Sequence, residues 1–178
     1  MSYGGTGFQP VNPWKSLDLI TQKRNLPHLQ TSEATYFVTF RCGKGIILPN
    51  AARELTLSAV RYWDGKRIDL DGAVVMLDHV HAMFRVVDAS TLSDIMHSIK
   101  SFSSNQINRL LRRKGQLWLD ESFDHIIRHE LEREEKLEYI RQNPVKNNLA
   151  ASPEDYPWLY VKNHRLEACA TCSTSQKP

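Results

Sequence analysis

The sequence predicts an α+β domain of the ferredoxin-like kind, in which helices cover an antiparallel sheet. Three observations support this fold class. Segments rich in β-branched and aromatic residues alternate with segments whose apolar residues recur at helical spacing. The segments follow the order strand, helix, two strands, helix, strand, helix. The chain has 178 residues, of which 41% are hydrophobic and 24% charged, which suits one domain with a sizeable core.

The first half of the domain is expected to contribute three strands and one helix. Residues 36–40, Tyr-Phe-Val-Thr-Phe, all favour β-structure and predict a buried strand. Asn50 stands where a helix N-cap is expected, and apolar residues follow at helical spacing until Gly65 ends the helix. Residues 73–76 and 79–87 predict two strands. The short segment between them favours a hairpin, although a single bent strand also fits the pattern.

The second half is expected to contribute two helices and one strand. Thr91 and Asp94 have the spacing of a capping box and predict the start of a helix that continues toward Gly115. The apolar face of this helix is expected to consist of Leu92, Ile95, Met96, Ile99 and Phe102. Residues 123–128 predict the fourth strand, and residues 130–142 predict a charged third helix.

The two ends of the chain differ from the middle in composition. We assign residues 31–163 to the folded domain, residues 1–30 to an N-terminal arm and residues 164–178 to a flexible tail. The N-terminus lacks the pattern of a signal peptide, and no apolar run has the length of a membrane span, so a cytoplasmic location is expected. Cys169 and Cys172 form a lone C-x-x-C, which is too little for a structural zinc site.

The charge of the chain permits nucleic-acid binding without arguing for it, because the net charge is only +3. The local pattern is more informative. Four cations, Arg109, Arg112, Arg113 and Lys114, fall within six residues that contain no acid. Such a cluster can contact DNA phosphates, or it can be the solvated end of a helix, and the sequence leaves both readings open.

A His-x-His triplet lies in one of the predicted strands. Side chains alternate along a strand, so His79 and His81 project from one face and Val80 projects from the other, which is apolar. Two neutral imidazoles side by side can bind one divalent ion. The same triplet also fits two ordinary histidines on a half-exposed strand, so it needs a third ligand and a reactive group nearby.

The third helix carries a possible reactive group. Tyr139 and Asn143 are four residues apart, which places them on one helix face, one turn from each other. Pro144 disfavours helical backbone at Asn143, so the helix is expected to fray there. A tyrosine oxygen that attacks a phosphodiester would need a metal ion to neutralise the phosphate. Tyr139 could equally be an aromatic residue packed beside Leu137 and Ile140.

Several short segments, taken in chain order, resemble the single-tyrosine HUH transposases, and among them the REP-associated tyrosine transposases. These segments span roughly residues 26–150 and comprise Leu26-Pro27-His28, 35–41, 75–81, 98–102, 121–128 and 138–146. Each is short, but their common order makes the resemblance specific. One departure is Leu77, where relatives commonly have proline; it alters the turn before His79 and removes no ligand.

The resemblance implies the fold and the chemistry of the site. It implies that residues 31–163 form a catalytic domain of the HUH endonuclease type, with Tyr139 as the nucleophile. It also implies that His79 and His81 bind a magnesium or manganese ion, and that Asn143 is the third, amide-bearing ligand. Ligand chemistry alone would favour another metal, because imidazole suits zinc, copper or nickel better than magnesium.

The resemblance further implies a DNA substrate, which would be single-stranded or folded as a hairpin from short palindromic repeats. The protein would act as a monomer or a homodimer and would associate with the bacterial nucleoid. We expect DNA to be contacted by Lys100, Arg112, Arg113, Lys114, Arg128, Arg141 and Lys146.

Three activities fit these residues. The first is transposase-like nicking and joining of single-stranded DNA through a 5′-phosphotyrosine. The second is a domesticated protein that binds DNA hairpins without productive cleavage, and the third is a metal hydrolase in which water is the nucleophile. The presence of both histidines together with Tyr139 and Asn143 favours the first.

Overall fold

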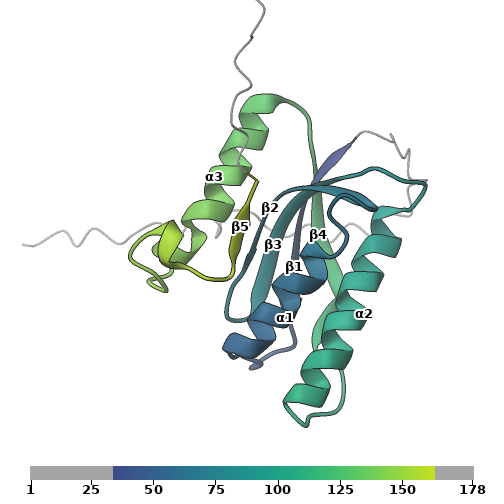
Figure 1. Ribbon diagram of the computed structural model, residues 1–178, viewed down its shortest axis with the longest axis vertical. Helices are drawn as coiled ribbons and strands as arrows, with labels where there is room; N and C mark the ends of the chain where they lie inside the picture. Colours follow the sequence, from purple (N-terminus) through teal and green to yellow (C-terminus); the bar gives the residue numbers. More distant parts are fainter. Residues whose placement is uncertain (1–33, 163–178) are drawn as a thin grey trace, which may run out of the picture.

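The computed structural model describes residues 34–162, which form a five-stranded antiparallel sheet in the order β4-β1-β3-β2-β5 together with three α-helices (Figure 1). The elements are β1 (Thr35–Cys42), α1 (Asn50–Arg61), β2 (Ile68–Val75), β3 (His79–Val86), α2 (Leu92–Leu110), β4 (Trp118–Ile127), α3 (Glu130–Lys146), the 3₁₀ turn η1 (Pro153–Asp155) and β5 (Leu159–Val161). The predicted fold class and order of elements are therefore confirmed. The short strand β5, which pairs with β2, was not predicted.

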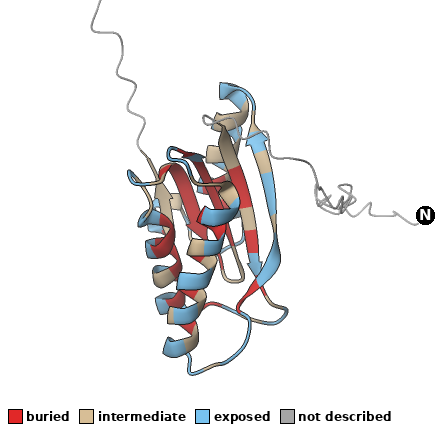
Figure 2. Cartoon of the chain, turned by 90° about the vertical axis from the view of Figure 1, so that its right-hand side faces the viewer, coloured by how far each residue is buried: buried red, intermediate tan, exposed pale blue. Residues whose placement is uncertain are grey.

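The helices lie on both faces of the sheet. α1 and α2 pack on one face, and α3 lies on the other (Figure 2). Alternation along β3 sends Val80, Ala82 and Phe84 into the larger core beneath α1 and α2, as the sequence predicted. A smaller core beneath α3 contains Met83 from β3 and Ile140 from the helix. Both faces of the sheet are thus covered by helices, and the histidines of β3 point toward α3.

Two strands are longer than the sequence suggested. β2 begins at Ile68 rather than near residue 73, and β4 begins at Trp118 rather than near residue 123. The sequence did not predict the first residues of β2 as a strand, because the charged residues Asp69 and Asp71 alternate there with the apolar ones. The predicted hairpin between β2 and β3 is confirmed, and its turn is closed by the amide of Met76, which donates to the carbonyl of His79 at 2.8 Å.

The helix starts and faces differ from prediction in two details. Pro49, not Asn50, is the N-cap residue of α1, and the Asn50 side chain instead accepts a hydrogen bond from Arg53. The capping box of α2 is confirmed, with Thr91 as N-cap and Asp94 as its partner. Phe102 is exposed rather than buried, because the buried stripe of α2 advances four residues at a time, through Ile95, Ile99, Ser103 and Ile107.

The third helix does not fray at Asn143, contrary to the prediction. α3 continues to Lys146 with Pro144 inside it. Proline costs only one intrahelical hydrogen bond here, and the helix end is stabilised beyond it. Asn148 adopts the left-handed conformation (φ 54°), and the amide of Leu149 donates to the carbonyl of Pro144 at 2.8 Å, which is the bonding pattern of a Schellman motif.

The predicted arm (1–30) and tail (164–178), including Cys169 and Cys172, lie outside the described residues. Among the helices of residues 34–162, none combines the length and apolar character needed to cross a bilayer.

Candidate functional site

Three side chains, from β3 and α3, meet on the face of the sheet that α3 covers. The rings of His79 and His81 lie 4.8 Å apart between centroids, and the ring of Tyr139 lies 5.1 Å from that of His81. The hydroxyl oxygen of Tyr139 is 3.4 Å from Nε2 of His81. The structure therefore brings the predicted nucleophile and one predicted metal ligand into contact, although the two residues are 58 positions apart.

Phe37 of β1 packs beneath His81 and Tyr139 in this site. Its ring is buried and stacks on His81 at 5.6 Å between centroids with an interplanar angle of 18°. The same ring meets Tyr139 edge-on at 6.0 Å. Aromatic contacts of this geometry fix ring orientations as well as burying area. Phe37 thus holds the imidazole of β3 and the phenol of α3 in one arrangement.

Both imidazoles are oriented by partners at Nδ1. Nδ1 of His81 lies 2.8 Å from the hydroxyl of Thr39, and Nδ1 of His79 lies 2.6 Å from a carboxylate oxygen of Asp78. When Nδ1 carries the proton and donates to these oxygens, Nε2 of each ring keeps its lone pair. Partners of this kind are typical of metal-binding histidines, because they fix the tautomer and the ring orientation.

The surroundings keep the two imidazoles neutral. Burial lowers the pKa of His81 to about 3, with further contributions from the neighbouring His79 and from the positive charges of Arg41 and Lys136. Burial also lowers the pKa of His79, and the carboxylate of Asp78 partly opposes this effect. Neutral imidazole is the form that binds a metal ion.

A divalent ion at this site would need a third ligand of another type. Within residues 34–162 no group of three or more His, Cys, Asp or Glu residues could hold a metal ion. The two oriented imidazoles nevertheless suit such an ion. Asn143 lies in α3 one turn after Tyr139 and is buried, and its amide oxygen accepts a hydrogen bond from Asn147 at 3.0 Å. Its role as the third ligand stays a prediction.

Comparison with known proteins assigns the chain to a family. The sequence model described as "Transposase IS200 like" matches residues 45–143, which is more than half of the chain. The chain belongs to the IS200-like transposase family. The matched region ends at Asn143 and contains His79, His81 and Tyr139.

One of two similar solved structures shows the same fold. A REP-associated tyrosine transposase, solved bound to a REP hairpin, superposes with a TM-score of 0.64 at 18% identity, over 76% of this chain and 81% of that one. A candidate transposase from Deinococcus radiodurans R1 aligns over 71% of this chain and 99% of its own, with 15% identity and a TM-score of 0.45. No curated protein matches the sequence.

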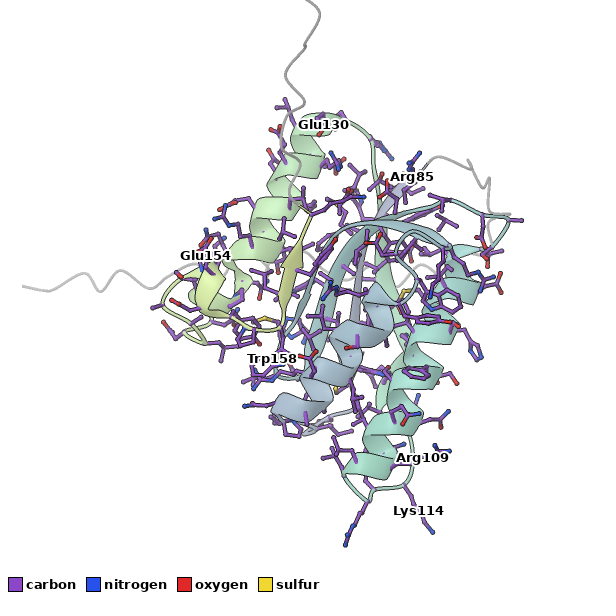
Figure 3. The ribbon with its side chains drawn as sticks, viewed as in Figure 1. Arg85, Arg109, Lys114, Glu130, Glu154 and Trp158 are labelled. Carbon is purple, nitrogen blue, oxygen red and sulfur yellow. The ribbon has the colours of Figure 1, made fainter. Side chains whose placement is uncertain are left out.

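In this IS200-like transposase, the predicted cationic cluster is remote from the tyrosine. Arg112 and Lys114 follow the end of α2, which packs on the face of the sheet opposite α3; Figure 3 shows Arg109 and Lys114 at that far end. The guanidinium of Arg113 donates to Asn108 and to the carbonyl of Gln116, which closes the loop after α2. These contacts do not test the prediction that the cluster binds DNA.

The other predicted DNA contacts are spread over the molecule. Lys100 donates to the main-chain carbonyls of Leu119 and Asp120 at 3.0 and 3.1 Å, which ties α2 to the start of β4. Arg141 of α3 forms an ion pair with Glu154, and Arg128 is exposed just before α3. Lys146 lies close to the site, with its ammonium nitrogen 5.9 Å from the centroid of the Tyr139 ring.

Sequence reasoning missed four residues that surround the candidate site. Thr39 and Asp78 orient the imidazoles, and Arg41 and Lys136 bring positive charge close to His81. Asp78 precedes His79 directly, so it could have been noticed. Thr39 and Arg41 could not, because only the pairing of β1 with β3 places them beside the histidines.

Proposed function

We propose that this IS200-like transposase nicks and rejoins single-stranded DNA, with Tyr139 as the covalent nucleophile. The observation that carries the proposal is the 3.4 Å contact between the Tyr139 hydroxyl and Nε2 of His81, an imidazole already oriented by Thr39. A tyrosine with only a packing role would not need its hydroxyl beside a pair of oriented imidazoles.

The proposed reaction conserves the phosphodiester bond energy. The phenol oxygen of Tyr139 forms a bond to phosphorus while the bond between phosphorus and the 3′-oxygen breaks. The phenol loses its proton and the leaving oxygen gains one, which gives a free 3′-hydroxyl and a 5′-phosphotyrosine. A 3′-hydroxyl can then attack the same phosphorus and release Tyr139, so that joining needs no nucleotide cofactor.

A magnesium or manganese ion would be held by His79, His81 and Asn143. When bound, such an ion supplies charge neutralisation at the non-bridging oxygens and orients the phosphate for in-line attack. The orientation of both imidazoles through Nδ1 supports this part of the proposal.

We infer that the substrate is hairpin-forming repeat DNA with a single-stranded flank. The REP-associated relative, which shares the fold, was solved bound to a REP hairpin. A hairpin with a flank should be cut, whereas a fully paired duplex of the same sequence should not, because a splayed strand must reach the phenol over the sheet. Equal cutting of both forms would indicate an ordinary duplex nuclease.

The decisive experiment is Tyr139→Phe, assayed with a labelled hairpin and manganese on a denaturing gel. The unchanged chain should form a covalent adduct that carries the 5′ end of the downstream fragment and maps to Tyr139. Tyr139→Phe keeps the ring and its contacts with Phe37 and His81, so the variant should fold while losing adduct, nicking and joining. Tyr62→Phe, the same change at an exposed tyrosine after α1, is the matched control and should be fully active.

The other two activities are distinguished by the same gel. Hairpin binding without an adduct, in the presence of manganese, would indicate the domesticated binding protein. Cleavage without an adduct, undiminished in Tyr139→Phe, would indicate metal-assisted hydrolysis by water.

A further inference from the structure

One row of residues crosses three strands of the sheet beside the tyrosine site. Thr39 of β1 pairs with His81 of β3 on one side and with Phe123 of β4 on the other. Directly paired residues project from the same face of a sheet. The contact between Thr39 and His81 confirms the face, so Phe123 also lies on the side of Tyr139. Two strand spacings place it about 10 Å from His81.

Phe123 is the first residue on this face of β4 that α3 leaves uncovered. Toward the end of β4, Ile127 packs into the core beneath α3, and His125 is bonded to Glu132 of that helix. Phe123 lies before both and is 55% exposed, whereas Phe37 in the next strand is 5% exposed. The edge strand is exposed along most of its length (Figure 2). An aromatic ring therefore faces solvent at the border of the site.

A cation lies in the neighbouring row. Arg41 of β1 pairs with His79 of β3, so it projects from the same face as Phe123. Its side chain is exposed and makes no ion pair with any residue in the range 34–162. The uncovered ring and the guanidinium thus lie in neighbouring rows of the sheet, on the β4 side of the histidines and on the face that Tyr139 contacts.

We propose that Arg41 and Phe123 form a binding subsite for the unpaired nucleotide next to the phosphate that Tyr139 attacks. This subsite rests on the function proposed above. The ring of Phe123 stacks on the base, and the guanidinium of Arg41 pairs with the backbone phosphate. A single exposed phenylalanine is common on protein surfaces. Phe123 differs from such residues because it lies in one row with His81 and has a cation beside it.

The ligand chemistry follows from these two groups. A flat apolar ring and a permanent positive charge match the base and the phosphate of one nucleotide. A base within a duplex is already stacked on its neighbours on both sides, so the ring of Phe123 cannot stack on it. The subsite therefore requires a single strand. Stacking accepts every base, so the subsite should hold the flank in place without reading its sequence.

The first test measures affinity with cleavage removed. All variants are made in Tyr139→Phe, and binding of a hairpin with a single-stranded flank is measured without divalent metal. Phe123→Ala should weaken binding by about 5- to 100-fold, whereas Phe123→Tyr, which keeps an aromatic ring, should bind with the affinity of the parent. Phe102→Ala, at a phenylalanine of nearly equal exposure on α2, is the control and should leave affinity unchanged.

The second test identifies the nucleotide by removing bases from the DNA. An abasic unit at one position of the flank should weaken binding by the same factor as Phe123→Ala. Combining the abasic unit with Phe123→Ala should cause no further loss, because each change removes the same contact. With the abasic unit at any other position, the fold loss of affinity that it causes should multiply the fold loss caused by Phe123→Ala.

The third test concerns the phosphate. Arg41→Gln should reduce the slope of log affinity against log salt by about 0.7, as expected for one phosphate of a single strand. Arg85→Gln is the control, because Arg85 lies on the same strand as His81 but is paired with Asp69 at 3.2 Å. Its substitution should not change the slope.

These measurements separate the subsite from the proposed function. Affinity that is unchanged in Phe123→Ala, or losses that multiply at every flank position, would overturn the subsite even where the chain with Tyr139 forms its adduct. Lack of an adduct together with the expected loss in Phe123→Ala would leave the subsite standing and remove the covalent mechanism.

Discussion

The pair formed by Asp71 and Arg133 attaches the tyrosine helix to the sheet, and breaking it should affect both stability and cleavage. Arg133 of α3 donates to both carboxylate oxygens of Asp71 in β2, at 3.0 Å from Nε and 2.5 Å from Nη2. The side chain of Asp71 is 7% exposed and that of Arg133 is 20% exposed. Tyr139 follows Arg133 by six residues, about 9 Å along the helix.

The magnitude follows from the burial of Asp71. Removing one member of a buried ion pair costs about 3–5 kcal/mol, because the remaining charge stays buried. We expect Arg133→Met to cost about 3 kcal/mol, since Arg133 is partly exposed and water can enter once it is gone. The double substitution Asp71→Asn with Arg133→Met removes both charges, so it should cost less than Arg133→Met alone.

Urea unfolding monitored by tryptophan fluorescence measures these stabilities, and the rate of adduct formation measures the position of Tyr139. The adduct rate should fall about 10-fold or more in Arg133→Met, because small displacements of a reacting group are costly. Arg85→Met removes the exposed pair with Asp69 and should cost at most about 1 kcal/mol. The ion pair does not attach α3 to the sheet if Arg133→Met costs no more than this control, or if the double variant is less stable than Arg133→Met.

Three further predictions concern the metal, the cationic cluster and the buried thiol. His79→Ala, His81→Ala, or EDTA added to the unchanged chain should abolish cleavage while leaving hairpin binding largely intact, because phosphate contacts supply most of the affinity. Undiminished cleavage on the gel would rule out the metal assignment. Replacing Arg112 and Arg113 together with Gln should lower the salt slope of binding by about one to two phosphates, and an unchanged slope would make the cluster a solvated helix end. Burial raises the pKa of Cys42 to about 12, so iodoacetamide at pH 8 should alkylate it only after unfolding, as read by peptide mass spectrometry. Only the unfolded chain loses the thiol proton between pH of about 9 and 12, so the unfolding free energy should fall there more steeply than in Cys42→Ala. Rapid alkylation of the folded protein would contradict this prediction.

The sequence was most informative where periodicity is local. Alternation along β3 is enough to separate His79 and His81 from Val80, and the capping residues Thr91 and Asp94 are enough to locate the start of α2. The spacing of Tyr139 and Asn143 places both on one face of α3. None of these patterns contains information about which strand lies beside β3. Arg41, Thr39 and Phe123 therefore gained a role only when the pairing of β1 and β4 was known.

The position of α3 on the sheet could not be predicted, because few of its contacts are of the kind that a hydrophobic pattern reveals. Ile140 and Pro144 are the only buried apolar residues of this helix. Its attachment depends instead on Asp71 and on Gly72, where an added Cβ would lie 3.1 Å from Cδ2 of Leu137 and 3.3 Å from the carbonyl of Tyr160.

The missing side chain at Gly72 lets two elements approach β2 at one point, the tyrosine helix α3 and the edge strand β5. β5 has three residues, all partly buried, and gives no strand pattern of its own. Both elements are thus positioned by residues 71 and 72, which lie where β2 and β3 shift register. Asp71 and Gly72 are far in sequence from Tyr139, yet through Arg133 and Leu137 they help to determine which face of α3 turns toward His81. The contact between the Tyr139 hydroxyl and the imidazole depends on that orientation.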